Sequence, residues 1–260
     1  MLLRTARLRC CTRTLRQCTK HLHFSTAAAT PFEFTPENFS KPELPSNLKV
    51  LDVPLTLATD ESLLGYGHIV RSKDQFTTEK GNFEITPWPV TGWRPLDPHT
   101  GDEAGTVEGD FDVHWEGDYF YGHNLAVATE NNFYLDGMGA LVEECDPQTA
   151  NGTGKEIYLW MSDYHPDGAQ LFWNDKGVPF AVNLALPTIG DGVQPSDMRA
   201  FYVPAGCGVY IHPSTWHNGV YTNPKYGKVR FLTRQSKIHA RVSVSWAAEF
   251  DCLLRVPLEL

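Results

Sequence analysis

The sequence contains no run of about 18 apolar residues, the length that a membrane-crossing helix needs. It has only six cysteines among its 260 residues, and none of them forms a Cys-x-x-Cys pair. Three of the six lie within the first 18 residues, so the rest of the chain offers neither a disulfide framework nor a thiolate zinc site. We therefore expect reduced thiols and no membrane partner.

Acidic residues are absent from the first 31 positions, which hold six of the 22 basic residues. The remainder carries 16 basic residues against 31 acidic ones, a formal charge of −15. This acidic body argues against nucleic acid as a partner, because phosphate binding needs a basic surface. The leader is rich in Arg, Thr, Cys, Ser and Ala. It predicts a mitochondrial transit peptide over residues 1–30, with a plastid address or a retained basic tail as alternatives.

Short apolar runs separated by Gly, Pro, Asn and Asp clusters begin at Lys49 and continue to the C-terminus. This pattern is typical of an all-β sandwich or barrel. Residues 31–48, which contain Pro, Glu and Ser with weak periodicity, predict a linker or surface arm. The clearest strands are predicted at residues 157–162, 170–173, 179–186, 199–203, 208–212, 229–232 and 242–246.

Two regions depart from the strand pattern. A short helix is predicted at Asp60–Leu64, between a capping residue and a glycine. Residues 81–116 hold three tryptophans and several prolines, which predicts a long ordered loop that forms either a lid or a dimer contact. If its end were a strand, Asp112, His114 and Glu116 would share one face, which we interpret as solvated or as an interface.

Two polar segments carry residue types suited to chemistry. The first contains Asp163, His165 and Gln170, and the second contains His212 and His217. In the second segment a Pro-x-Gly turn leads into a strand and then to the histidines, an order that resembles the second sequence motif of cupins. The first segment then stands where the first cupin motif belongs, in which His-x-His and a later Glu converge on a metal.

The first segment departs from that cupin pattern at two positions. Asp163 stands in place of the first histidine and Gln170 in place of the glutamate, so only His165 matches. Two histidines with carboxylates suit a divalent Mn, Fe or Zn ion, whereas a neutral glutamine weakens the ligand set. The resemblance leaves two alternatives. Either a metal is held by Asp163, His165, Gln170 and His212, or the site works without one.

Among cupins, the residues of the two segments and their spacing resemble those of the ureidoglycolate lyase family. The matching residues are His165, Gln170, Lys176-Gly177, Arg199-Ala200-Phe201, Gly208-Val209, His212, Trp216-His217, Pro54-Leu55-Thr56, Gly65–Val70 and Asp251–Pro257. The resemblance covers about residues 50–75 and 157–257, with residues 76–156 as a long insertion. It implies a cupin-type double-stranded β-helix (jelly-roll) barrel over residues 49–260, a homodimer, and cleavage of ureidoglycolate to glyoxylate and urea in purine (allantoin) catabolism.

The candidate residues suit such a cleavage. It needs a base for the hydroxyl proton and an acid for the departing nitrogen, and histidine serves both roles near neutral pH. The candidate catalytic residues are His165, Gln170, Lys176, His212 and His217. A cation would hold the substrate carboxylate by charge-assisted hydrogen bonds. The candidates for that role are Lys176, Arg199, Arg230 and Arg234.

Two other functions stay open at this point. One is a metal-dependent cupin oxygenase or isomerase, in which Asp163, His165 and His212 hold iron or manganese. The other is a cupin domain that binds a small molecule without catalysis, since the fold alone does not define a function. The neutral Gln170 favours the lyase over the oxygenase, because oxygenases need a full set of metal ligands. We interpret the isolated His68 as structural.

Overall fold

The structure is a computed structural model that describes residues 47–75, 92–97, 100, 107–116, 119–128, 134–136, 156–227, 229–235 and 240–260. The predicted transit peptide, nearly all of the predicted arm and most of the predicted loop at 81–116 lie outside the described residues. Within the described part, no helix combines the length and the apolar character needed to cross a membrane.

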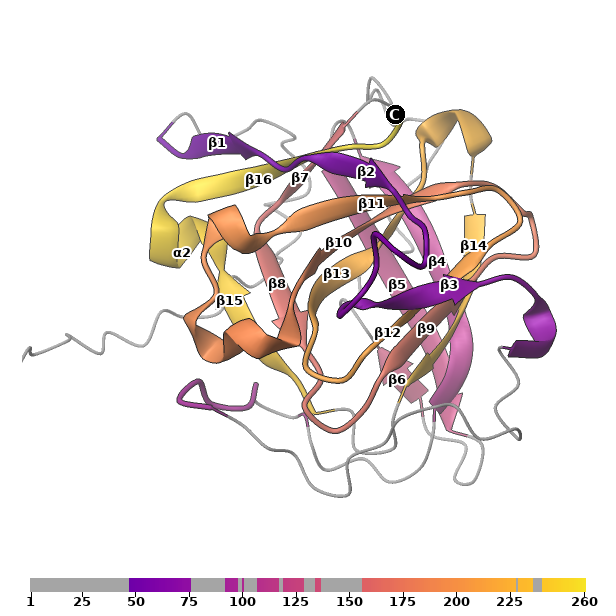
Figure 1. The fold of residues 1–260 in the computed structure, drawn as a ribbon, viewed down its shortest axis with the longest axis horizontal. Helices are drawn as coiled ribbons and strands as arrows, with labels where there is room; N and C mark the ends of the chain where they lie inside the picture. Colours follow the sequence, from indigo (N-terminus) through magenta and orange to yellow (C-terminus); the bar gives the residue numbers. More distant parts are fainter. Residues whose placement is uncertain are drawn as a thin grey trace, which may run out of the picture.

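Most of the described residues form β-strands, which confirms the predicted all-β class (Figure 1). The strands are β1 (Lys49–Asp52), β2 (Leu55–Leu57), β3 (Gly67–Val70), β4 (Val107–Glu116), β5 (Tyr119–Ala128), β6 (Tyr134–Asp136), β7 (Glu156–Leu159), β8 (Met161–Tyr164), β9 (Gln170–Trp173), β10 (Phe180–Ala185), β11 (Arg199–Val203), β12 (Gly208–Ile211), β13 (Trp216–Tyr221), β14 (Val229–Gln235), β15 (Val242–Ser245) and β16 (Cys252–Pro257). One short α-helix, α2 (Trp246–Phe250), joins β15 to β16.

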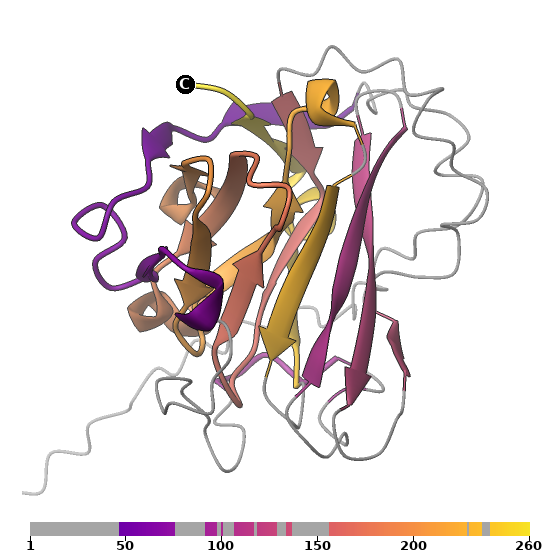
Figure 2. The same ribbon diagram turned by 90° about the vertical axis from the view of Figure 1, so that its right-hand side faces the viewer.

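These strands form three sheets. A six-stranded sheet has the order β15-β8-β13-β10-β11-β2, and a seven-stranded sheet has the order β3-β12-β9-β14-β4-β5-β6. The strands β1, β16 and β7 form a smaller sheet, which lies at the top of Figure 1. Figure 2 shows the two large sheets edge-on as separate layers. Their closure into a barrel stays a prediction.

The core between the two large sheets is apolar. Phe172 and Phe231 of the seven-stranded sheet belong to the same buried cluster as Phe180, Val182 and Leu184 of β10. The Phe180 and Phe231 rings meet edge to face with their centroids 5.0 Å apart. Because successive strand residues point to opposite faces, the inner face of each strand can be read from these residues.

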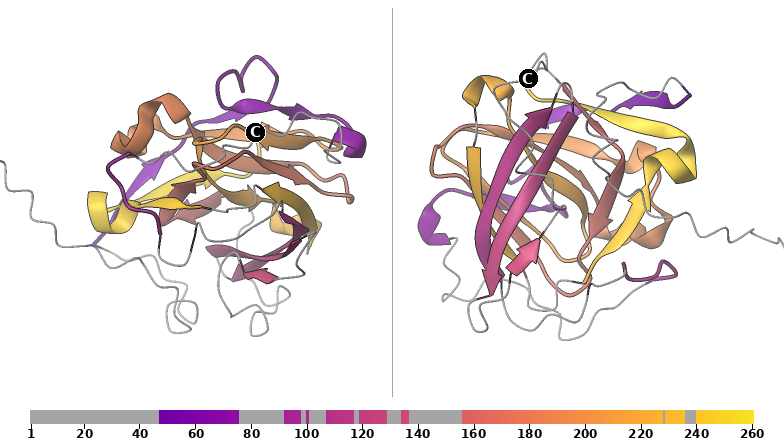
Figure 3. Two further views of the ribbon diagram at one scale, coloured as in Figure 1. Left: turned by 90° about the horizontal axis from the view of Figure 1, so that it is seen from below. Right: turned by 180° about the vertical axis from the view of Figure 1, so that it is seen from behind.

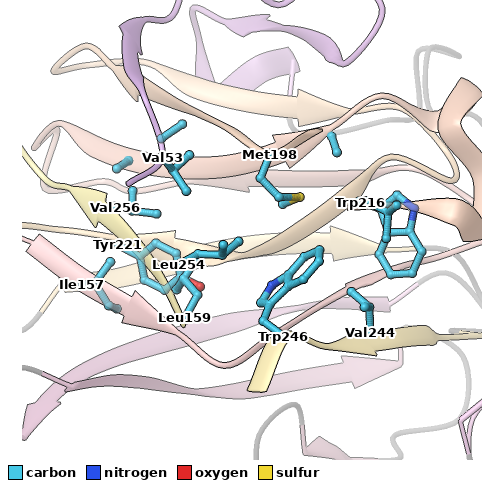
Figure 4. Close-up of a cluster of buried hydrophobic side chains, with 14 of the residues drawn as sticks. Val53, Ile157, Leu159, Met198, Trp216, Tyr221, Val244, Trp246, Leu254 and Val256 are labelled. Atoms are coloured by element: carbon cyan, nitrogen blue, oxygen red, sulfur yellow. The ribbon is translucent and has the colours of Figure 1, made fainter. Parts of the chain in front are cut away.

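A second core covers the other face of the six-stranded sheet. There the fully buried Trp216 and Trp246 pack with Leu254 and Val256 of β16 (Figure 4). The six-stranded sheet is therefore buried on both faces, which explains why all six residues of β10 are buried.

Two expectations from the sequence are wrong. Residues 60–66 form turns instead of a helix, because Gly65 takes a φ of +88° and ends the segment after a single turn. Residues 107–116, predicted as part of a loop, form the strand β4, which pairs with β14 over residues 107–113. Seen from behind in Figure 3, β4 and β5 run as two long neighbouring strands.

Candidate active site

Polar side chains replace apolar ones at one end of the space between the two large sheets. Gln170 opens β9 two residues before Phe172 and therefore shares its inward face. His217 of β13 lies opposite the core residue Leu184 in the ladder, so it also faces inward. Asp163 of β8 is the register partner of His217 on the other side. The three residues thus meet from three different strands.

A β-bulge in β13 sets the direction of His217. In the pairing with β10, Val220 stands opposite Val182 and His217 opposite Leu184, so β13 holds one extra residue at 218–219. The Asn218 side chain supports the bulge, because it accepts a hydrogen bond from Ser162 Oγ at 2.6 Å and donates to the Met161 carbonyl. The bulge keeps His217 and Val220 on the inner face together.

His165 follows β8 directly and is buried beside His217, with the two ring centroids 5.1 Å apart. Its Nδ1 donates to the Ala240 carbonyl at 2.8 Å, so Nε2 is the nitrogen that carries the lone pair in the neutral ring. Burial lowers the pKa of His165 to about 4; the charge of His217 adds to this, and Asp163 opposes it. At neutral pH this ring is therefore uncharged, with Nε2 3.8 Å from Asp163 Oδ2.

His217 has hydrogen bonds at both ring nitrogens. Nδ1 lies 2.8 Å from the Thr215 carbonyl, and Nε2 lies 2.6 Å from Gln170 Oε1. Both partners are acceptors, so this arrangement fits the imidazolium form, in which both nitrogens donate. If the Gln170 amide turned over, its nitrogen could donate to a neutral His217. Thr233 accepts a hydrogen bond from Gln170 Nε2 at 3.3 Å. After the amide turned over, the Thr233 hydroxyl could donate to Gln170 Oε1.

Asp163, His165 and His217 offer three metal-ligating atoms within 4.8 Å of one another. Two imidazoles and one carboxylate suit iron, manganese or zinc, so the donor set fits the divalent metal considered from the sequence. The group contains His217 where the sequence suggested His212. Gln170 contacts this group through its hydrogen bond to His217 Nε2.

The structure places His212 and Lys176 away from this group. His212 is partly exposed and lies beside Tyr210 and His68, with ring centroids 5.6 and 6.4 Å from its own. Tyr210 points to the outer face of the seven-stranded sheet, since its neighbours Val209 and Ile211 belong to the inner core. Lys176 lies in the turn at the opposite end of β9 from Gln170 and donates to the Tyr226 carbonyl.

The three arginines suggested for a substrate carboxylate also lie elsewhere. Arg199 is exposed and donates to the carbonyls of Ser196 and Met198. Arg230 and Arg234 alternate with the buried residues of β14 and so take its other face.

Sequence reasoning missed two residues near the site. Thr233 and Gln235 continue the alternation of β14 beyond the predicted strand end at 232, and both are buried. Gln235 is the register partner of Gln170, so their side chains share a face. Within the described part of the chain, Gln235 Oε1 is buried without a hydrogen-bond donor. Extending the alternation by three residues could have found both.

The fold and this site define an all-β domain with a buried histidine and carboxylate group between two sheets. The family model of ureidoglycolate lyase matches residues 123–244, a range that begins in β5 and ends in β15. Residues 123–244 are therefore similar to the ureidoglycolate lyase family, a cupin-like family, which supports the resemblance found in the sequence motifs. The match contains the complete Asp163, His165 and His217 group. No curated protein matches the chain.

Proposed function

We propose that the protein cleaves ureidoglycolate to glyoxylate and urea at the Asp163, His165 and His217 group. The family domain supports a lyase role in purine catabolism. The observation that carries the proposed reaction is the buried histidine pair, in which a neutral His165 lies beside a His217 that can donate from both nitrogens. Such a pair supplies a base and an acid within one small site.

The reaction breaks one C–N bond and forms one C=O bond without adding water. The substrate hydroxyl loses its proton as its oxygen becomes the aldehyde oxygen of glyoxylate. The electron pair of the C–N bond leaves with the ureido nitrogen, which takes up a proton to complete urea. One proton is therefore removed at oxygen and one is delivered at nitrogen.

His165 is suited to remove the hydroxyl proton. Its lone pair is on Nε2 in the neutral ring, because Nδ1 donates to the Ala240 carbonyl. Asp163 at 3.8 Å would stabilise the positive charge that this ring gains. His217 is suited to deliver the second proton from Nε2, and Gln170 can hydrogen-bond to His217 before and after that transfer by turning its amide.

Gln235 can accept a hydrogen bond from the ureido group, which is the part of the substrate that leaves as urea. A ureido group carries N–H donors, and an acceptor for them is needed inside a buried site. Gln235 is 3% exposed, and its Oε1 accepts no hydrogen bond within the described residues. Because Gln235 shares a face with Gln170, this acceptor lies on the side of the site next to His217.

A metal-dependent oxygenase or isomerase is the second candidate, and the Asp163, His165 and His217 donor set favours it. If a divalent cation binds, these three residues would hold it and it would supply Lewis acidity toward substrate oxygens. The neutral Gln170 and the hydrogen bonds at both ring nitrogens of His217 favour the acid–base lyase instead, because a metal would need the lone pair of one of these nitrogens.

The test is the release of glyoxylate and urea from ureidoglycolate by the full chain, run anaerobically, with EDTA and with added Mn²⁺. The acid–base lyase predicts equal amounts of both products in every condition. Release that disappears with EDTA and returns with Mn²⁺ would contradict the metal-free route and support a metal-assisted lyase. No release in any condition, together with bound iron or manganese, would favour the oxygenase or isomerase.

A further inference from the structure

Arg241 precedes β15 and is anchored at one end of its guanidinium group. Its Nε donates to Asp97 Oδ2 at 2.5 Å, and Ser243 Oγ donates to the same oxygen at 2.6 Å. The backbones also meet, because Asp97 N donates to the Arg241 carbonyl at 2.8 Å. The side chain of Arg241 is 29% exposed and that of Asp97 is 17% exposed, so the pair is largely shielded from water.

Asp97 is itself fixed in place by Arg94. The Arg94 guanidinium donates two hydrogen bonds to Glu249, at 2.9 and 2.7 Å, and its backbone N–H donates to Asp191 Oδ2 at 2.5 Å. Tyr164 binds the other oxygen of Asp191 at 2.7 Å. This double attachment holds residues 92–97 against the six-stranded sheet, so Asp97 presents a fixed anchor to Arg241.

The register of β15 directs Arg241 toward the histidine group. Ser243 lies opposite Asp163 and Val242 opposite Tyr164, so Arg241 and Ser243 share the face of Asp163. The preceding residue, Ala240, accepts the hydrogen bond of His165. Burial disfavours the charge of Arg241, but Asp163 and then Asp97 outweigh it and raise its pKa, so the guanidinium is charged beside the site.

The terminal nitrogens of Arg241 are available. Within the part of the chain that the structure describes, the hydrogen bonds and ion pairs of its guanidinium group use Nε alone. A guanidinium group presents its remaining N–H donors in a planar fork that matches the two oxygens of a carboxylate.

We propose that Arg241 binds the carboxylate of the substrate through Nη1 and Nη2, and thereby selects small 2-hydroxy or 2-oxo carboxylates for this site. This assignment rests on the proposed lyase function and gives it the carboxylate-binding residue that the four cations suggested from the sequence do not supply. Arg241 then sets the orientation of the substrate, with the carboxylate at β15 and the reacting carbon at the histidines.

Isothermal titration of the full chain with glyoxylate and, separately, with urea tests the assignment. Arg241→Gln should weaken glyoxylate binding at least about tenfold, the loss of a charge-assisted bidentate pair, and leave urea binding unchanged. Arg71→Gln is the matched control, because it removes an exposed arginine that pairs with Asp60 at 2.6 Å, and both affinities should stay as in the wild type. Asp97→Asn should weaken glyoxylate binding less than Arg241→Gln does.

Arg241→Lys keeps the experiment decisive if Arg241→Gln does not fold, as judged by thermal melting. Lysine retains the charge without the fork, so glyoxylate binding should still weaken by several-fold. Glyoxylate binding at wild-type strength in a folded Arg241 variant would overturn the assignment, even if the wild type cleaves ureidoglycolate. If the wild type cleaves nothing but its glyoxylate binding depends on Arg241, the assignment holds and the lyase proposal fails. A wild type that does not bind glyoxylate overturns both.

Discussion

Two pairs of histidines in this protein differ in their burial and in the sheet face that they occupy. His165 and His217 are buried, face the inter-sheet core, and contact Asp163 and Gln170. In the other pair, His68 stacks on Tyr210 at a centroid distance of 4.5 Å and His212 lies partly exposed beside the same ring. The strand face and the burial of a histidine, more than its place in a motif, decide whether it can carry proton transfer.

The backbone between His212 and His217 explains how two residues five positions apart separate. Ser214 takes a φ of +60°, and its N–H donates to the His165 carbonyl at 2.9 Å. This turn joins the end of β12, in the seven-stranded sheet, to the start of β13, in the six-stranded sheet. His212 and His217 consequently belong to different layers.

Removal of the proposed base should give the largest difference in activity between the two pairs. His165→Gln should lower kcat/KM for ureidoglycolate by about 10²–10⁴, the usual contribution of a general acid–base residue. His68→Gln, from the other pair, should leave kcat/KM within about twofold. Steady-state assays of both variants measure this, and an equal loss in the two would contradict the different roles of the pairs.

The stability of the protein at low pH should also separate the pairs. Unfolded histidine takes up a proton near pH 6.5, whereas folded His165, with its pKa lowered to about 4, does not. The stability associated with the neutral ring is present above pH 6.5 and is lost as pH falls toward 4, by about 3 kcal/mol. Urea unfolding at pH 7 and pH 4.5, with EDTA, should show a smaller decrease for His165→Gln than for the wild type. Equal decreases would contradict the buried neutral ring.

The neutral amide beside His217 gives a sharper test within the active pair. Gln170→Glu should hold His217 as a fixed imidazolium, because a carboxylate stabilises its charge. We expect kcat to fall by about tenfold or more, and the pH dependence of kcat to shift upward. Gln170→Met, of similar length, is the control that removes the hydrogen bond without adding charge. A Gln170→Glu enzyme with wild-type kcat and pH profile would show that His217 does not change its protonation.

Substitution in the outer pair, His68 and His212, should have the smallest effect. His212→Gln should change the free energy of unfolding by less than about 1 kcal/mol, because a partly exposed ring loses little packing on substitution. Urea denaturation at pH 7 measures the change. A loss above about 3 kcal/mol would indicate that His212 supports the fold.

The sequence predicted the strands better where the alternation was local. The strands at 170–173 and 199–203 have the bounds that the pattern predicted. The stretch predicted as one strand over 157–162 divides at Trp160, because β7 and β8 join different sheets. The helix α2 was missed, although Ser245 accepts a hydrogen bond from Ala248 N at 3.2 Å in a local capping pattern.

The site was predictable only in part, for a physical reason. Asp163, His165 and Gln170 lie close in the chain, so one motif found them together. The inward direction of His217 depends on the bulge at 218–219, which no local sequence pattern predicts. The pairing of Arg241 with Asp97 joins residues 144 positions apart, and only the folded structure brings them together.

The rate of glyoxylate and urea release from ureidoglycolate by the wild type, His217→Gln and His212→Gln, measured side by side, decides whether the reaction takes place at the buried pair. We expect equal release of both products by the wild type, a loss of about 10²–10⁴ in His217→Gln, and nearly unchanged release in His212→Gln. Wild-type activity that survives in His217→Gln but disappears in His212→Gln would place the reaction at the outer pair and contradict catalysis at His165 and His217.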